Sequence, residues 1–148
     1  MIVTVEELSQ TSLYPEVIAA ITRNNPEAAA LQILAAESLC KTYLTKYDLK
    51  AAFGDEDTPP TVTSPALKKI VKMIASYYLV RMAAPNVNVE LFRDDYLAAM
   101  QLLTDIRDGS NSLTELTYPQ DDPDTPDIDE SNQTGVAWGS NPKRTNHF

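Results

Sequence analysis

Cysteine, histidine and glycine are scarce in this sequence of 148 residues. A single cysteine, Cys40, excludes an internal disulfide, and in a helical pattern its expected role is that of a small buried hydrophobe. The only histidine, His147, is the next-to-last residue, where a rigidly held general base is not expected. The four glycines form neither GxxxxGK[ST] nor GxGxxG, the usual phosphate-binding loops. We therefore expect no enzyme and no cofactor.

Long apolar runs and an excess of basic residues are also missing. No segment reaches about 18 consecutive apolar residues, so no transmembrane helix is expected. The first residues, MIVTVEELSQ, lack the basic and apolar regions of a signal peptide. The net charge of −9 disfavours nucleic acid and an anionic membrane surface as partners, because both would need clustered Lys and Arg. We expect the protein to be cytosolic in the cell that makes it.

Residues 1–109 carry repeated helix-start signals. Thr4 and Glu7 form a capping-box pattern, and prolines follow Tyr14, Asn25 and Ser64, which suits the first turn of a helix. Two short helices are predicted, one over about residues 5–10 and one that begins at Pro15. Three long helices are predicted over about 26–46, from Pro65 to the break at Pro85, and from the cap Asn88 to Gly109. A short helical turn from Leu49 to Phe53 ends at Gly54. No stretch before residue 110 alternates with period two. The expected fold class is all-α: a small bundle of three long and about two short helices with an extended C-terminal arm.

Apolar residues at steps of three and four predict which face of each long helix points inward. The predicted stripes are Leu31, Leu34, Ala35, Leu39 and Tyr43 in the first long helix; Leu67, Ile70, Val71, Ile74 and Tyr78 in the second; and Leu91 or Phe92, Tyr96, Ala99, Leu103 and Ile106 in the third. The helical spacing of Tyr43, Tyr47, Tyr77 and Tyr78 indicates a core or a subunit interface rather than a platform for stacking bases.

The composition changes after Gly109. We divide the chain into a helical domain (1–109), an acidic, proline-rich extended linker (110–135) and an aromatic and basic docking tip (136–148). The linker contains DDPDTPDIDE, whose prolines and lack of glycine do not fit an EF-hand loop, so solvated charge is favoured over weak Ca²⁺ binding and no metal site is predicted. The predicted partner-binding residues of the tip are Trp138, Lys143, Arg144 and Phe148, because Trp and Arg are frequent interface anchors.

Three lysines, Lys68, Lys69 and Lys72, form a basic strip on the helix that begins at Pro65. The ordinary interpretation is a solvated helix face. The functional alternative is an inter-subunit or intramolecular contact, in which the strip receives an acidic linker from a neighbouring chain or from its own.

Several segments together resemble the small neck proteins of Mu-like phages and prophages, of the head–tail connector or adaptor class. These segments are VTVEEL…LYPEVIAAITR, YLTKYDLKAAFG, LKKIVKMIASYYLVR, DIRDG and WGSNPKR, in that order. The resemblance implies a helical subunit that assembles as a homo-oligomeric ring, commonly twelvefold, beneath the portal. It also implies that the C-terminal arm contacts the portal protein or neighbouring neck and tail proteins, that DNA passes through only as cargo, and that the protein resides in the virion neck after assembly in the host cytoplasm.

Two functions of different classes follow from these observations. The first is a structural head–tail connector of a tailed bacteriophage, with the tip as its contact. The second is a soluble acidic protein-binding module or DNA mimic, which would depend on the acidic residues Asp121, Asp122, Asp124 and Asp127 rather than on the tip.

Overall fold

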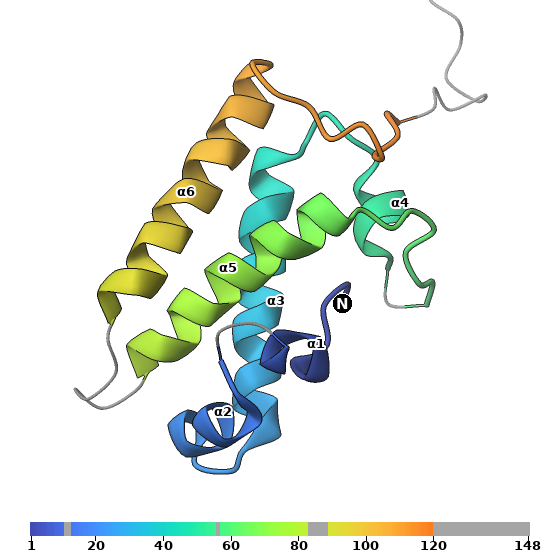
Figure 1. The fold of residues 1–148 in the computed structure, drawn as a ribbon. Helices are drawn as coiled ribbons and strands as arrows, with labels where there is room; N and C mark the ends of the chain where they lie inside the picture. Colours follow the sequence, from blue (N-terminus) through green and yellow to red (C-terminus); the bar gives the residue numbers. More distant parts are fainter. Residues whose placement is uncertain (11–12, 56, 83–88, 120–148) are drawn as a thin grey trace, which may run out of the picture.

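The computed structural model describes residues 1–10, 13–55, 57–82 and 89–119, and within these ranges it contains six α-helices and no strand (Figure 1). The helices are α1 (Val5–Ser9), α2 (Pro15–Thr22), α3 (Pro26–Tyr43), α4 (Leu49–Phe53), α5 (Pro65–Met82) and α6 (Val89–Asp108). The predicted all-α class is confirmed. The expected break at Pro85 and the cap Asn88 lie outside the described residues.

The helix starts follow the predicted caps. The Glu7 amide donates to Thr4 Oγ1 at 3.1 Å, and the Thr4 amide donates back to Glu7 Oε2 at 3.3 Å. The Glu27 amide donates to Asn25 Oδ1 at 3.0 Å at the start of α3. Since α3 ends at Tyr43, it is three residues shorter than expected.

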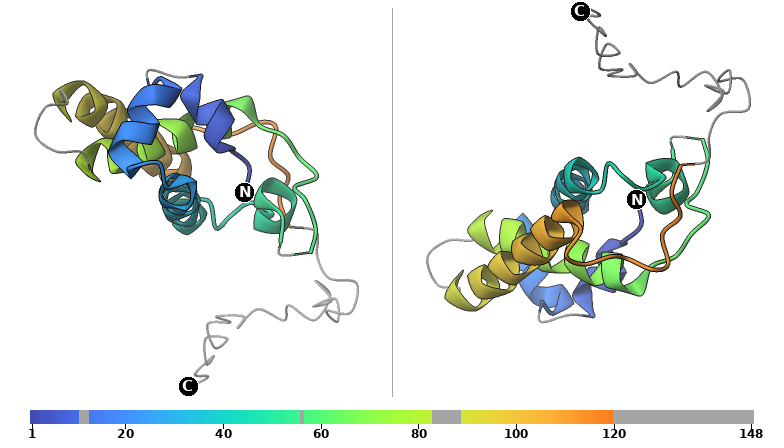
Figure 2. Two further views of the ribbon diagram at one scale, coloured as in Figure 1. Left: turned by 90° about the horizontal axis from the view of Figure 1, so that it is seen from below. Right: turned by 90° about the horizontal axis from the view of Figure 1, so that it is seen from above.

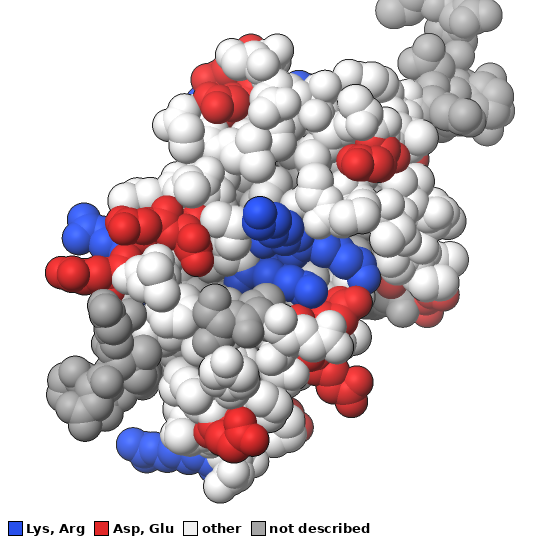
Figure 3. All heavy atoms as spheres, viewed as in Figure 1, with Lys and Arg blue, Asp and Glu red and all other residues white. Residues whose placement is uncertain are grey.

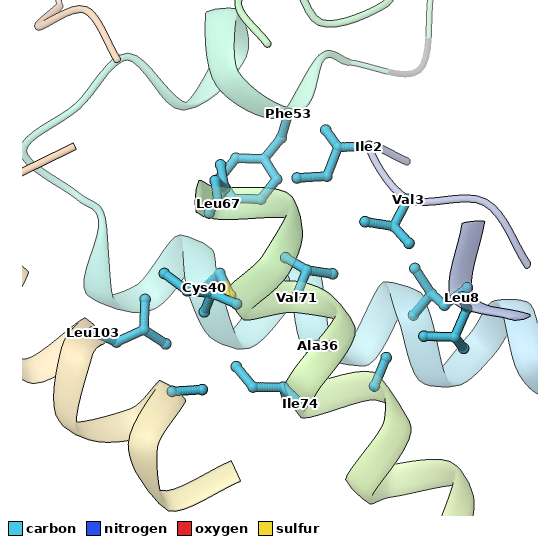
Figure 4. Packing of buried hydrophobic residues seen from close by; sticks show 14 of the residues in the cluster. Ile2, Val3, Leu8, Ala36, Cys40, Phe53, Leu67, Val71, Ile74 and Leu103 are labelled. Carbon is cyan, nitrogen blue, oxygen red and sulfur yellow. The ribbon is translucent and has the colours of Figure 1, made fainter. Parts of the chain in front are cut away.

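The core forms where α5 packs against α3 on one side and α6 on the other. Figure 4 shows Val71 and Ile74 of α5 meeting Cys40 of α3 and Leu103 of α6, and all four side chains are buried. At one end, α2 packs against α3 and α5, and α1 packs against α3 and α2, whereas α4 lies at the other end (Figure 2). The predicted stripe of α5 is confirmed from Leu67 to Ile74, and that of α6 is confirmed with Phe92, not Leu91, facing inward.

The predicted inward stripe of α3 is wrong at three positions. Leu31, Leu34 and Ala35 face outward, and the exposed fractions of the two leucines are 62% and 48%. The buried side of α3 consists instead of Ala29, Ile33, Ala36, Glu37 and Cys40. Residues 28–40 are apolar nearly all round the helix, so their periodicity does not distinguish the two faces.

The packed chain continues beyond Gly109, after which the sequence predicts the linker. Leu113 and Leu116 are both buried, and the Leu113 amide donates to the Tyr47 hydroxyl at 3.1 Å. The Asp48 amide donates to the Thr117 carbonyl at 2.9 Å. Residues 110–119 therefore cross from the end of α6 to α4 and cover the core there (orange in Figure 1).

Tyrosines join elements rather than form an open platform. Tyr47 is buried, and its ring stacks on that of Tyr118 with centroids 5.3 Å apart. Tyr77 of α5 stacks on Tyr96 of α6 at 4.5 Å, and both are half-buried against the core. The expected core role is confirmed for Tyr47, which is buried, and for Tyr43, Tyr77 and Tyr78, which are partly buried against the core. Tyr118, in contrast, is 61% exposed.

Candidate functional site

The three lysines singled out in the sequence line a groove between α5 and α6, which we call the lysine groove. Its volume is about 470 Å³. Its lining residues are Pro65, Lys68, Lys69, Lys72, Met73 and Ser76 of α5 and Phe92 and Asp95 of α6. Figure 3 shows basic side chains gathered over α5 in the middle of one face, with acidic side chains to both sides.

The position of the groove follows from the helical repeat and from the start of α5. Ser64 caps this helix, since the Leu67 amide donates to Ser64 Oγ at 3.2 Å. Lys68 and Lys72 are one turn apart, and Lys69 lies beside them on the next row of side chains. The first turn of α5 contains no acidic residue, so nothing on this turn offsets the positive end of the helix dipole.

The lysines differ in their electrostatic surroundings. Lys68 Nζ lies 2.9 Å from Glu7 Oε1, and this hydrogen bond is the main reason that the pKa of Glu7 is lowered. For Lys69 and Lys72, no ion pair occurs within the described ranges. Asp95 lies on the α6 side of the groove. Lys72 also lowers the pKa of Glu7 through a longer-range charge interaction. The α5 side therefore offers Lys69 and, in part, Lys72 to an incoming anion.

The lining of the groove combines these cations with apolar groups. Met73 is half-buried, and Phe92 is buried. Such a site suits an extended acidic peptide, whose carboxylates would meet the lysines while its apolar atoms cover Met73 and Phe92. In the part of the chain that the structure describes, no three His, Cys, Asp or Glu side chains are grouped to hold a metal ion.

A second groove, between α1 and α2, was not predicted from the sequence. Its volume is about 480 Å³, and it is lined by Val5, Glu6, Ser9, Pro15, Ile18, Ala19, Thr22, Asn24 and Pro26. Arg23 and Asn24 both adopt positive φ, which turns the chain sharply from α2 into α3 beside this groove. Asn tolerates positive φ and the cap Asn25 with Pro26 predicts a break here, so only the positive φ of Arg23 has no signal in the sequence.

The predicted contact residues of the tip, Trp138, Lys143, Arg144 and Phe148, lie outside the described residues. In the ranges that are described, no helix is both long enough and apolar enough to cross a membrane.

One comparison identifies the family. The family model described as Bacteriophage Mu, Gp36 matches residues 3–131. The chain belongs to this family. The match includes all six helices and the acidic segment that follows them, and it ends before the tip. The resemblance to a Mu-like phage protein is thereby confirmed. No curated protein and no solved structure matches the chain.

Proposed function

We propose that this member of the Mu Gp36 family is a structural head–tail connector. In this role the protein forms a homo-oligomeric ring beneath the portal protein, in the virion neck, and DNA passes through the ring only as cargo. The observation that carries the proposal is the family match over residues 3–131, which makes the chain a phage protein. The proposal is for a structural protein rather than an enzyme.

The outer face of α3 supports contact with a second copy. Leu31, Leu34 and Ala35 are exposed there, and the only charged residue between Glu27 and Lys41 is buried Glu37. An uncharged apolar helix face in an otherwise acidic protein is typical of a surface that another chain covers. In a closed ring this face would form one contact per copy. The contacts of all copies would then stabilise the ring together, even if each is modest.

The C-terminal arm supports contact with a neighbouring ring. The sequence supplies an anchor-type residue, Trp138, together with the basic pair Lys143 and Arg144. A ring presents many such tips at once, and this multivalency makes a weak individual contact sufficient.

The proposal is tested by binding to the cognate portal complex, with mass measured by light scattering. We expect the full-length chain to add mass in multiples that match the portal ring and a chain truncated after Gly135 to add none. A truncated chain that binds normally would contradict the role of the tip, and failure of both chains to bind would contradict the connector itself.

The role of the α3 face is tested by Leu34→Glu. We expect this variant to remain folded and to lose ring formation on the portal. Leu97→Glu is the matched control, because Leu97 of α6 has a similar exposed fraction, 51%, but lies one turn after the charged residue Asp94. Equal effects of the two changes would rule out a specific α3 contact.

Replacing Asp121, Asp122, Asp124 and Asp127 with Asn distinguishes the DNA-mimic function from the connector function. A mimic would lose its activity through this change, because its charges are its binding surface. A connector would still join the portal, since its contact residues are in the tip.

A further inference from the structure

The lysine groove is a cationic site for which no ligand is assigned. Lys69 and Lys72 have no ion-pair partner within the described ranges, although the whole chain carries a net charge of −9. Beside these lysines, the apolar groups of Met73 and Phe92 form part of the lining. The chemistry of the groove selects an extended peptide that is rich in carboxylates and contains an occasional apolar side chain.

Such a peptide follows the described chain directly. Residues 121–130, DDPDTPDIDE, contain six acidic residues, no basic residue and one large apolar residue, Ile128. The prolines at 123 and 126 favour an extended backbone, which lowers the entropy cost of laying the segment along a groove. Asp95 makes the α6 side less favourable for carboxylates, so the acidic side chains would face Lys69 and Lys72 on the α5 side.

The described chain places this segment within reach of the groove. Ser64 Oγ donates to Glu115 Oε2 at 3.0 Å, which holds residue 115 at the start of α5. An α-helix rises about 1.5 Å per residue, so Lys72 lies about 12 Å along α5 from Ser64. Pro119, the last described residue, lies at most about 13 Å from residue 115, because four residues separate them and each advances about 3.3 Å when extended. Residues 120–127 can span about 26 Å, so the acidic residues from Asp127 onward can reach Lys69 and Lys72 of the same chain.

We propose that residues 121–130 bind in the lysine groove of their own chain in the free protein. Covalent attachment gives the segment an effective concentration on the order of millimolar, so a weak, largely electrostatic contact suffices. Because the ammonium groups are partly exposed, salt screens the attraction, and at about 0.5 M salt the Debye length falls to roughly 4 Å. The bound segment would hold the docking tip close to the helical domain until a partner displaces it.

A spin label on the segment tests the proposal in the full-length chain. Thr125→Cys provides the attachment point, because the native Cys40 is buried and burial raises the pKa of its thiol to about 12. In a ¹⁵N-labelled sample, we expect strong paramagnetic broadening of the amides of Lys69, Lys72 and Phe92. The broadening should disappear at about 0.5 M salt, because the screened ion pairs no longer hold the segment.

Two comparisons make the test specific. Lys69→Gln with Lys72→Gln should abolish the broadening, whereas Arg23→Gln with Lys50→Gln, which removes the same charge outside the groove, should leave it intact. A spin-labelled ¹⁴N chain mixed with an unlabelled ¹⁵N chain should produce no broadening. Two outcomes would overturn binding within one chain. The first is broadening that occurs only in this mixture, and the second is an absence of broadening at the groove amides of the spin-labelled ¹⁵N chain. No portal is involved, so either outcome is independent of the connector proposal.

Discussion

The buried carboxylate of Glu37 accepts a hydrogen bond from the backbone amide of Ile2 at 2.6 Å. Its second oxygen lies 3.9 Å from the Met1 ammonium group. Glu37 lies in the middle of α3, and the exposed fraction of the residue is only 3%. This contact places Ile2 and Val3, both buried, beside the central helices, as Figure 4 shows for the two side chains.

We predict that Glu37→Ala destabilises the protein by about 2 kcal/mol, because the buried Ile2 amide then lacks an acceptor. Glu37→Gln should destabilise the protein less than Glu37→Ala, since the glutamine amide oxygen can still accept the hydrogen bond. Urea denaturation measures both effects through the free energy of unfolding. Equal stability of Glu37→Ala and the parent chain would show that this hydrogen bond does not hold the N-terminal segment.

Glu7 should make stability depend on pH. Its folded-state pKa is lowered, first by the hydrogen bond from Lys68, so the stabilisation is present above the ordinary value of 4.5 and is lost as pH falls through the folded pKa. Because the pair is about one-third exposed, we expect less than about 1 kcal/mol. Thermal unfolding from neutral pH down to below 4.5 should show this loss in the parent chain. In Glu7→Gln, stability should be lower at neutral pH and should fall less on acidification; an unchanged pH profile would contradict the assignment.

Two glycines provide a matched test of backbone strain. Gly54 has φ of 74°, and a Cβ there would lie 2.6 Å from the Thr58 carbonyl oxygen. Gly109 has φ of 85°, but a Cβ there would meet nothing within 4 Å. We expect Gly109→Ala to lower the free energy of unfolding by about 1 kcal/mol, because alanine disfavours positive φ. Gly54→Ala should lower it by about 3 kcal/mol, because a clash with the backbone adds to the same strain. Chemical denaturation of both variants measures the difference, and similar costs would contradict the close approach at Gly54.

Leu116 tests where the packed domain ends. Its side chain is buried although it follows Gly109, so Leu116→Ala should destabilise the helical domain by about 2 kcal/mol. Thr114→Ala is the control, because Thr114 is exposed in the same segment. The measurement is the urea midpoint of each variant. If Leu116→Ala unfolds at the same urea concentration as the control, residues 110–119 do not contribute to the core.

Much of the fold was predictable because its signals are local. The caps Thr4, Asn25 and Ser64 each satisfy amides within three residues, so the sequence alone indicates where α1, α3 and α5 begin. The lysine strip was also predictable, since its spacing places it on one helix face. The groove was not, because Phe92 and Asp95 come from α6 and reach it only through the packing of α6 on α5.

The sequence by itself determined the all-α class, the helix starts and the acidic segment that follows the domain, because each depends on neighbours along the chain. Tertiary structure decided which face of α3 is buried, since both faces are apolar and the packing on α5, together with the hydrogen bond from Ile2 to Glu37, distinguishes them. It also decided that residues 110–119 belong to the packed domain. Leu113 and Leu116 are only two apolar residues in a polar segment, and they become core residues because Tyr47, Asp48 and Ser64 pair with the polar groups around them.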